Sequence, residues 1–74
     1  MRPELLGMSN EELIQWACKY GCIGERELRK QWDGLELFCL QNPVGLSSLL
    51  DWIVEYSNDG YSLKQSITLA KKGW

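Results

Sequence analysis

Leu46-Ser-Ser-Leu-Leu-Asp-Trp-Ile-Val-Glu-Tyr56 is the stretch that decides the fold of this 74-residue chain. At the helical repeat its apolar residues gather on one broad face, and only two serines, an aspartate and a glutamate remain for water. A helix that contacts the rest of a protein on one side needs an apolar stripe of about 100°, and this face is wider. We therefore expect a central helix over residues 46–56 that is packed between the other helices.

Capping patterns on either side of this segment indicate further helices. Ser9-Asn-Glu-Glu12 and Ser62-Leu-Lys-Gln65 have the serine-to-Glu/Gln spacing of a capping box. Gly21 suits a left-handed helix end, and Asn42-Pro43 ends a helix because the residue before proline avoids helical angles. Asp33-Gly-Leu-Glu36 is a further cap-and-acid pattern, so we expect one helix to end and another to begin there.

These signals predict an all-α fold: a compact single domain of five short helices. The expected ranges are 10–20, 25–32, 34–41, 46–56 and 62–72, after an extended lead-in over residues 1–8. The 34–41 helix is apolar nearly all round, so we expect it to be buried. A strand over residues 37–40 is the alternative, although no partner strand is evident. The apolar residues of this segment are Leu35, Leu37, Phe38, Cys39 and Leu40.

Composition is typical of a globular protein and limits the classes of function. Hydrophobic residues make up 45% of the chain and charged residues 24%, a balance that suits a folded domain. The formal net charge of −2 argues against a surface that binds nucleic acid throughout, because phosphate neutralisation requires a cationic excess. No apolar run approaches the about 18 residues that span a bilayer. We expect a soluble, cytoplasmic protein with no membrane partner.

Residues suited to catalysis or metal binding are scarce. Histidine is absent, which removes the commonest general base and the usual activator of a serine or cysteine nucleophile. Cys18, Cys22 and Cys39 are an odd number for a disulfide framework, and their spacing is wider than the Cys-x-x-Cys of structural zinc sites. We therefore expect buried free thiols, and neither a metal, a cofactor, a small-molecule substrate nor an enzymatic activity.

The first candidate binding surface lies on the second predicted helix. Arginine and tryptophan are enriched among residues that dominate protein interfaces, and interleaved charges of both signs suit a protein partner better than a phosphate backbone. The alternative is a solvated face of weak ion pairs, with the tryptophan on the core seam. The candidate residues are Arg26, Arg29, Lys30 and Trp32.

The second candidate is the last predicted helix, which has a polar face without an acid. Together with the central helix and the turn at Gly60, it resembles a helix-turn-helix unit over residues 46–74, whose second helix presents such side chains to DNA. Lysines in a last turn also complement the helix dipole, which is the simpler explanation. The candidate residues are Lys64, Gln65, Thr68, Lys71 and Lys72.

Four tryptophans are many for a chain of this length. Each buries about 150–250 Å² when it lies in a core, and five short helices have a limited interior. We expect at least one of them to lie at the surface, as a partner site or a homodimer contact. The four are Trp16, Trp32, Trp52 and Trp74.

The sequence favours a small non-enzymatic protein that binds another protein stoichiometrically, as an adaptor or an inhibitor. A chain of this length that opens on methionine fits that role, and phages and other mobile elements commonly encode such binders. A helix-turn-helix DNA-binding protein is the alternative, and self-assembly into a homo-oligomer is a third possibility.

Overall fold

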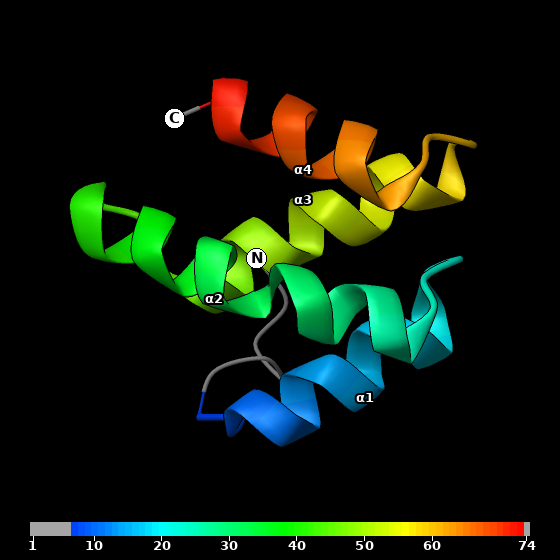
Figure 1. Cartoon of the computed structure of the whole chain (residues 1–74), viewed down its shortest axis with the longest axis horizontal. Coiled ribbons are helices and arrows are strands. Elements are labelled where there is room, and N and C mark those ends of the chain that lie inside the picture. The colour runs from blue at the N-terminus through cyan, green and yellow to red at the C-terminus, as the bar shows by residue number, and fades with distance from the viewer. Residues whose placement is uncertain (1–6, 74) are drawn as a thin grey trace.

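Four helices form the protein in the computed structural model, which describes residues 7–73 (Figure 1). They are α1 (Asn10–Tyr20), α2 (Glu25–Gln41), α3 (Leu46–Asn58) and α4 (Leu63–Lys72). No residue between 7 and 73 is in a strand, so the predicted all-α fold is confirmed and the strand alternative is wrong. The number of helices is four and not five. The predicted lead-in falls mostly outside the described residues.

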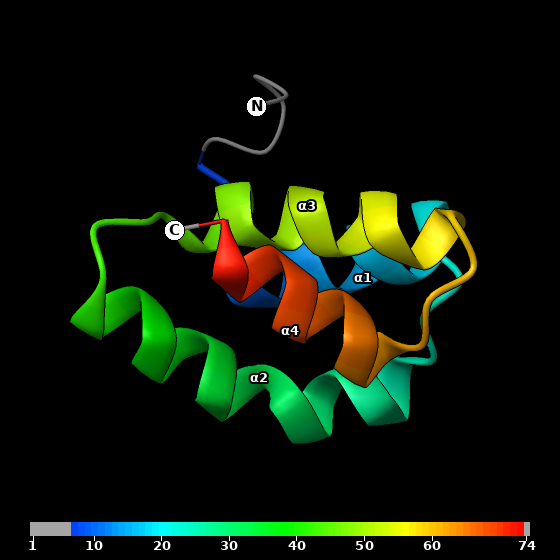
Figure 2. The same cartoon turned by 90° about the horizontal axis from the view of Figure 1, so that it is seen from above.

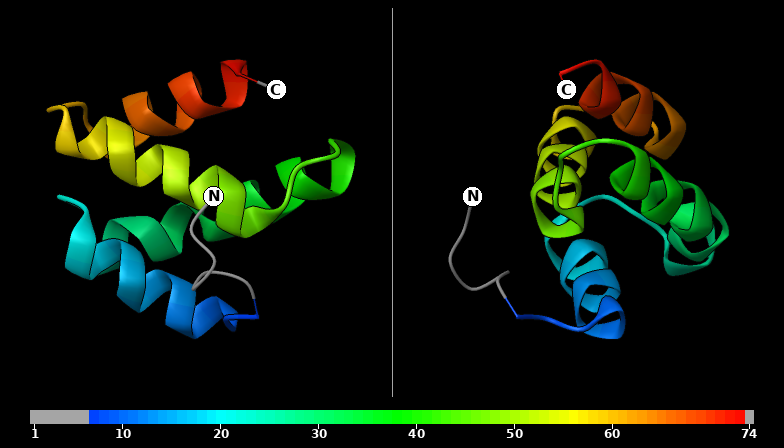
Figure 3. Two further views of the ribbon diagram at one scale, coloured as in Figure 1. Left: turned by 180° about the vertical axis from the view of Figure 1, so that it is seen from behind. Right: turned by 90° about the vertical axis from the view of Figure 1, so that its left-hand side faces the viewer.

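α3 is the helix around which the others assemble. α1, α2 and α4 each contact it, with α1 on one side and α4 on the other (Figure 3). Its residues Leu49, Leu50, Ile53 and Val54 are fully buried. Burying one such side chain stabilises a fold by about 1.5–3 kcal/mol, which explains why this segment organises the chain. The expectation of a central apolar helix is confirmed.

α2 is continuous where the sequence predicted two helices, over residues 25–32 and 34–41. The predicted break at Asp33 falls inside the helix. Leu28, Trp32 and Leu35 form a buried seam that runs through this point, and packing of an apolar face contributes more to helix stability than a local stop signal does. The seam therefore keeps the helix intact through Asp33 and Gly34.

The last turns of α2 are more exposed than the sequence predicted. Leu37 is 54% exposed and Leu40 85%, whereas Phe38 and Cys39 are half-buried. The end of α2 extends beyond the neighbouring ends of α3 and α4 (Figure 2), so only one side of it meets the core. The expectation that residues 34–41 are buried all round is wrong.

Both predicted capping boxes are present. Ser9 Oγ accepts a hydrogen bond from the Glu12 N–H at 3.2 Å, and Glu12 Oε1 accepts one from the Ser9 N–H at 3.1 Å. Ser62 and Gln65 are joined in the same way at the start of α4, at the same two distances. These bonds satisfy N–H groups that have no partner inside the helix.

Gly21 ends α1 in a different conformation from the one predicted. Its φ is −109° and its ψ 164°, which is extended backbone, so the predicted left-handed end is wrong. A Cβ at this position would lie 3.0 Å from the Ala17 carbonyl oxygen and 3.2 Å from the Ile23 side chain. Close approach of the chain to α1 is therefore what favours glycine here.

The described residues contain neither a membrane-spanning helix nor a metal site. No helix within residues 7–73 is long and apolar enough to cross a bilayer, and no group of three or more Cys, Asp or Glu residues in this range could hold a metal ion. The three cysteines are free. Burial raises the pKa of the Cys18 and Cys39 thiols, whereas Cys22 is exposed, contrary to the expectation that all three are buried.

Candidate protein-interaction surface

The first candidate surface does not come together as one patch. Trp32 is 6% exposed and belongs to the core, so it offers no contact area to a partner. Lys30 Nζ lies 3.7 Å from a carboxylate oxygen of Glu27, one turn earlier in α2. Arg26 is exposed. The prediction of a protein interface here depended on Trp32. Its burial agrees with the alternative interpretation, in which this tryptophan lies on the core seam.

Arg29 is committed to a network between α1 and α2. Its Nε donates to Glu25 Oε2 at 3.1 Å, and its guanidinium also pairs with Glu11 on α1. Gln15 Nε2 donates to the other oxygen of Glu25 at 3.1 Å. The hydrogen bond from Arg29 lowers the pKa of Glu11, and those from Gln15 and then Arg29 lower the pKa of Glu25. These contacts fix α1 against the first turns of α2.

The second candidate surface, on α4, is partly used within the helix. The Gln65 side chain accepts the N–H of Ser62 in the capping box. Thr68 Oγ1 donates to the carbonyl of Lys64, one turn earlier, at 3.0 Å. Both side chains are exposed, as is Lys64, and each makes one hydrogen bond within α4.

The two lysines at the end of α4 point in different directions. Lys71 Nζ lies 5.3 Å from the centroid of the Phe38 ring of α2, a cation–π contact that holds it against the fold. Lys72 is exposed. α4 runs back along α3 as a helical hairpin (Figure 2), whereas the second helix of a helix-turn-helix unit crosses the first at about 90–120°.

A third surface, which the sequence reasoning did not single out, runs along α3 and α4. Trp52 is 52% exposed and Tyr61 45%, and the half-buried Tyr56 lies between them. Ring centroids are 6.1 Å apart for Trp52 and Tyr56, and 5.9 Å apart for Tyr56 and Tyr61, which meet edge to face. Leu69 of α4 lies beside them. We call Trp52, Tyr56, Tyr61 and Leu69 the aromatic face.

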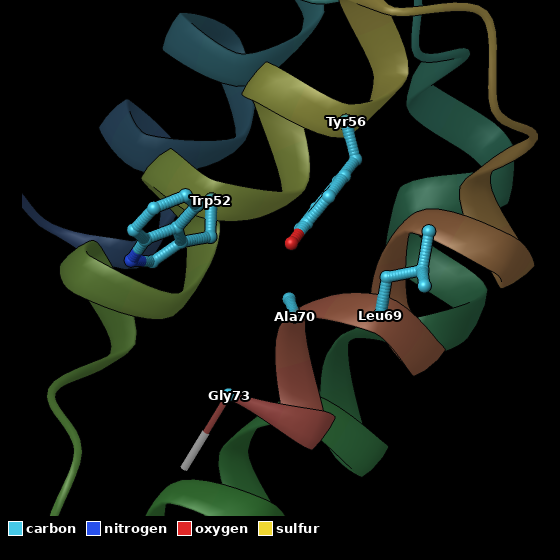
Figure 4. A pocket seen from close by; sticks show the side chains of 5 residues that line it. All are labelled: Trp52, Tyr56, Leu69, Ala70 and Gly73. Carbon is cyan, nitrogen blue, oxygen red and sulfur yellow. The ribbon is translucent and has the colours of Figure 1, made fainter.

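Three hollows surround the aromatic face. One of about 290 Å³ lies between α3 and α4 (Figure 4). In this hollow the Tyr56 ring points from α3 toward Ala70 of α4, with Trp52 and Leu69 at its sides. The other two have volumes of about 330 and 300 Å³ and lie on the outer flanks of α3 and α4. The surface is therefore a sequence of shallow hollows separated by aromatic rings.

The two flanks of the aromatic face differ in charge. Asp51, Glu55 and Asp59 follow one another at intervals of four residues on the α3 flank, where they line one hollow together with Trp52 and Tyr56. On the α4 flank the same interval relates Lys64, Thr68 and Lys72. We call these two sets the acidic row and the basic row. An apolar strip thus lies between rows of opposite charge.

The predicted surface tryptophan is Trp52, while Trp16 and Trp32 are buried and Trp74 lies outside the described residues. A signal for Trp52 was present in the sequence. It stands at the edge of the apolar face of the central helix, where a partner helix must reach furthest to cover it.

Comparisons with protein-family models, with curated proteins and with solved structures find no match. The candidate surface is therefore interpreted from its own geometry.

Proposed function

We propose that the chain is a small protein-binding module that acts without catalysis, by occupying a partner protein through the aromatic face. The observation that carries the proposal is that the exposed rings of Trp52 and Tyr61 each contact the ring of the partly buried Tyr56, so that the three form one aromatic row at the surface. Contiguous exposed apolar area marks interaction sites on small proteins. Tryptophan and tyrosine are enriched among the residues that dominate interface energy.

The surroundings of the aromatic face favour a protein over other ligands. Its hollows, of about 290–330 Å³, are at the lower limit of small-molecule pockets, which enclose most of their ligand within about 300–1,000 Å³. Open hollows of this size suit single side chains of a partner. The acidic row would repel a phosphate backbone, whereas rows of both signs suit the polar rim of a protein interface.

Affinity capture tests the proposal with matched variants. Wild type, Trp52→Ala and Tyr20→Ala serve as baits in a lysate of the organism that encodes the chain, with and without nuclease. Tyr20 is the control because it is equally exposed, at 52%, and lies on α1, across α3 from α4 (Figure 1). We expect one stoichiometric protein that survives nuclease, persists with Tyr20→Ala and is lost with Trp52→Ala.

Two results would contradict the proposal. Equal capture by Trp52→Ala and wild type would remove the aromatic face from the contact. Recovery of nucleic acid that is abolished by Lys64→Glu with Lys71→Glu, but not by Trp52→Ala, would support the helix-turn-helix alternative instead. Far-UV circular dichroism of each bait shows whether it is folded before it is compared.

A further inference from the structure

We infer that the aromatic face also receives a second copy of the chain, in a two-fold symmetric dimer. The inference uses the face assigned in the proposed function but does not depend on the existence of a different partner. It goes beyond that function because it names an occupant whose charges and shape are known, namely this same surface.

The charge pattern of the face is complementary to itself. An isologous dimer requires a surface that fits its own copy after a half-turn rotation. A half-turn about an axis that lies in the plane of the contact and runs along the helices turns the second copy over onto the first and exchanges the flanks, so the basic row of one copy lies over the acidic row of the other. A patch of a single charge sign would repel its own copy, whereas this one attracts it.

The antiparallel course of α3 and α4 determines which residues meet. Lys64 lies in the first turn of α4, at the end where Asp59 caps α3. This half-turn leaves the two ends in place, so Lys64 of one copy approaches Asp59 of the other, and Lys72 approaches Asp51. Along the middle of the face, Trp52 and Tyr56 of one copy lie over α4 of the other. The hollows beside these rings receive the rings of the second copy.

The other exposed apolar area lacks this self-complementarity. At the end of α2, Leu40 and Leu46 line a hollow of about 240 Å³ together with Cys39 and Glu36. Its lining includes an acid and no base, so it offers no pair of opposite charges to a second copy of itself. The second copy is therefore assigned to the aromatic face.

The dimer should be in rapid exchange with the monomer. The contact is confined to the aromatic face and its two rows, and weak, transient contacts typically bury less than about 1,200 Å² in total. We expect a dissociation constant on the order of 10 µM. Dimerisation and binding of a different partner would then compete for the same surface, and dilution would favour the partner.

Sedimentation equilibrium of the purified full chain, from about 1 µM to 1 mM, tests the dimer. Trp52→Ala should raise the dissociation constant by about tenfold or more, while Tyr20→Ala should leave it within about twofold. Asp59→Lys and Lys64→Glu should each weaken the dimer by about three- to tenfold at low salt. Combining them restores opposite charges across the interface, so the double variant should return close to wild type.

A mass that stays monomeric over the whole range overturns the inference. So does a dimer that withstands Trp52→Ala, or a double variant no tighter than the single reversals. These failures are distinct from failure of the proposed function. A monomeric chain that captures a protein through Trp52 overturns the dimer alone, whereas a Trp52-dependent dimer whose capture of a partner ignores Trp52 overturns the proposed function alone.

Discussion

Continuity of α2 through Asp33 and Gly34 predicts the sign of two substitutions. A Cβ added to Gly34 would meet no atom within 4 Å, and its φ is not positive. Alanine is favoured over glycine by about 0.8–1.0 kcal/mol in a helix interior, partly because glycine gives the unfolded chain more freedom. Gly34→Ala should therefore raise the free energy of unfolding by about 1 kcal/mol.

Asp33→Ala distinguishes a continuous α2 from an arrangement of two separate helices. In a helix interior aspartate is less favourable than alanine by up to about 0.7 kcal/mol, so the substitution should stabilise the protein. If Asp33 capped a second helix, the same substitution would cost about 1 kcal/mol. The two arrangements thus predict opposite signs.

Urea unfolding followed by far-UV circular dichroism measures both changes, and thermal unfolding gives a second reading. A gain of 1 kcal/mol corresponds to about 4–8 °C in a domain of this size. Gly24→Ala is the control, since its Cβ also meets no atom within 4 Å but the residue is the N-cap of α2, where alanine is no improvement. Loss of stability in Gly34→Ala or Asp33→Ala would refute the continuous helix.

Three further changes test the structure. Ser66 Oγ is buried without a hydrogen-bond partner among the described residues, so Ser66→Ala should raise the unfolding free energy by about 0.5–2 kcal/mol in the same urea assay; a loss would show that the hydroxyl is bonded. Gly60 has a φ of +102°, a backbone conformation that strains alanine. Gly60→Ala should therefore lower the free energy of unfolding by about 1–3 kcal/mol, and the unfolding temperature with it. An unchanged temperature would contradict that backbone conformation. Because the pKa values of Glu11 and Glu25 are lowered in the folded state, their contribution is complete above the ordinary carboxylate pKa and is lost as pH falls through the lowered values. The urea midpoint should therefore decrease as the pH is lowered from about 5 to about 2, and it should decrease less steeply in Arg29→Gln. Equal slopes for wild type and Arg29→Gln would contradict the network.

Local sequence signals predicted the parts of the fold that local interactions determine. The capping boxes at Ser9 and Ser62 involve residues three apart, so they are visible in the sequence. The continuity of α2 was not, because Asp33-Gly34 is a local stop signal that the seam at Trp32 outweighs. Burial of that seam depends on where α3 and α1 lie, which single-sequence periodicity does not specify.

The candidate surface was predictable only in part, for the same reason. A surplus of tryptophan indicated that one would be exposed, and Trp52 is. Which one depends on how the helices are placed around α3, and α4 leaves the Trp52 edge of α3 open. Conversely, Arg29 and Trp32 had the composition of an interface, but the fold uses Arg29 to join α1 to α2 and Trp32 to fill the core.

The most direct test of the central claim, that the aromatic face is the contact surface, is the affinity of the captured protein for wild type, Trp52→Ala and Tyr20→Ala. Isothermal titration calorimetry should show Trp52→Ala binding at least about 30-fold more weakly, the loss expected of a dominant interface residue. Tyr20→Ala should bind within about twofold of wild type. Equal affinities for wild type and a folded Trp52→Ala would contradict the claim.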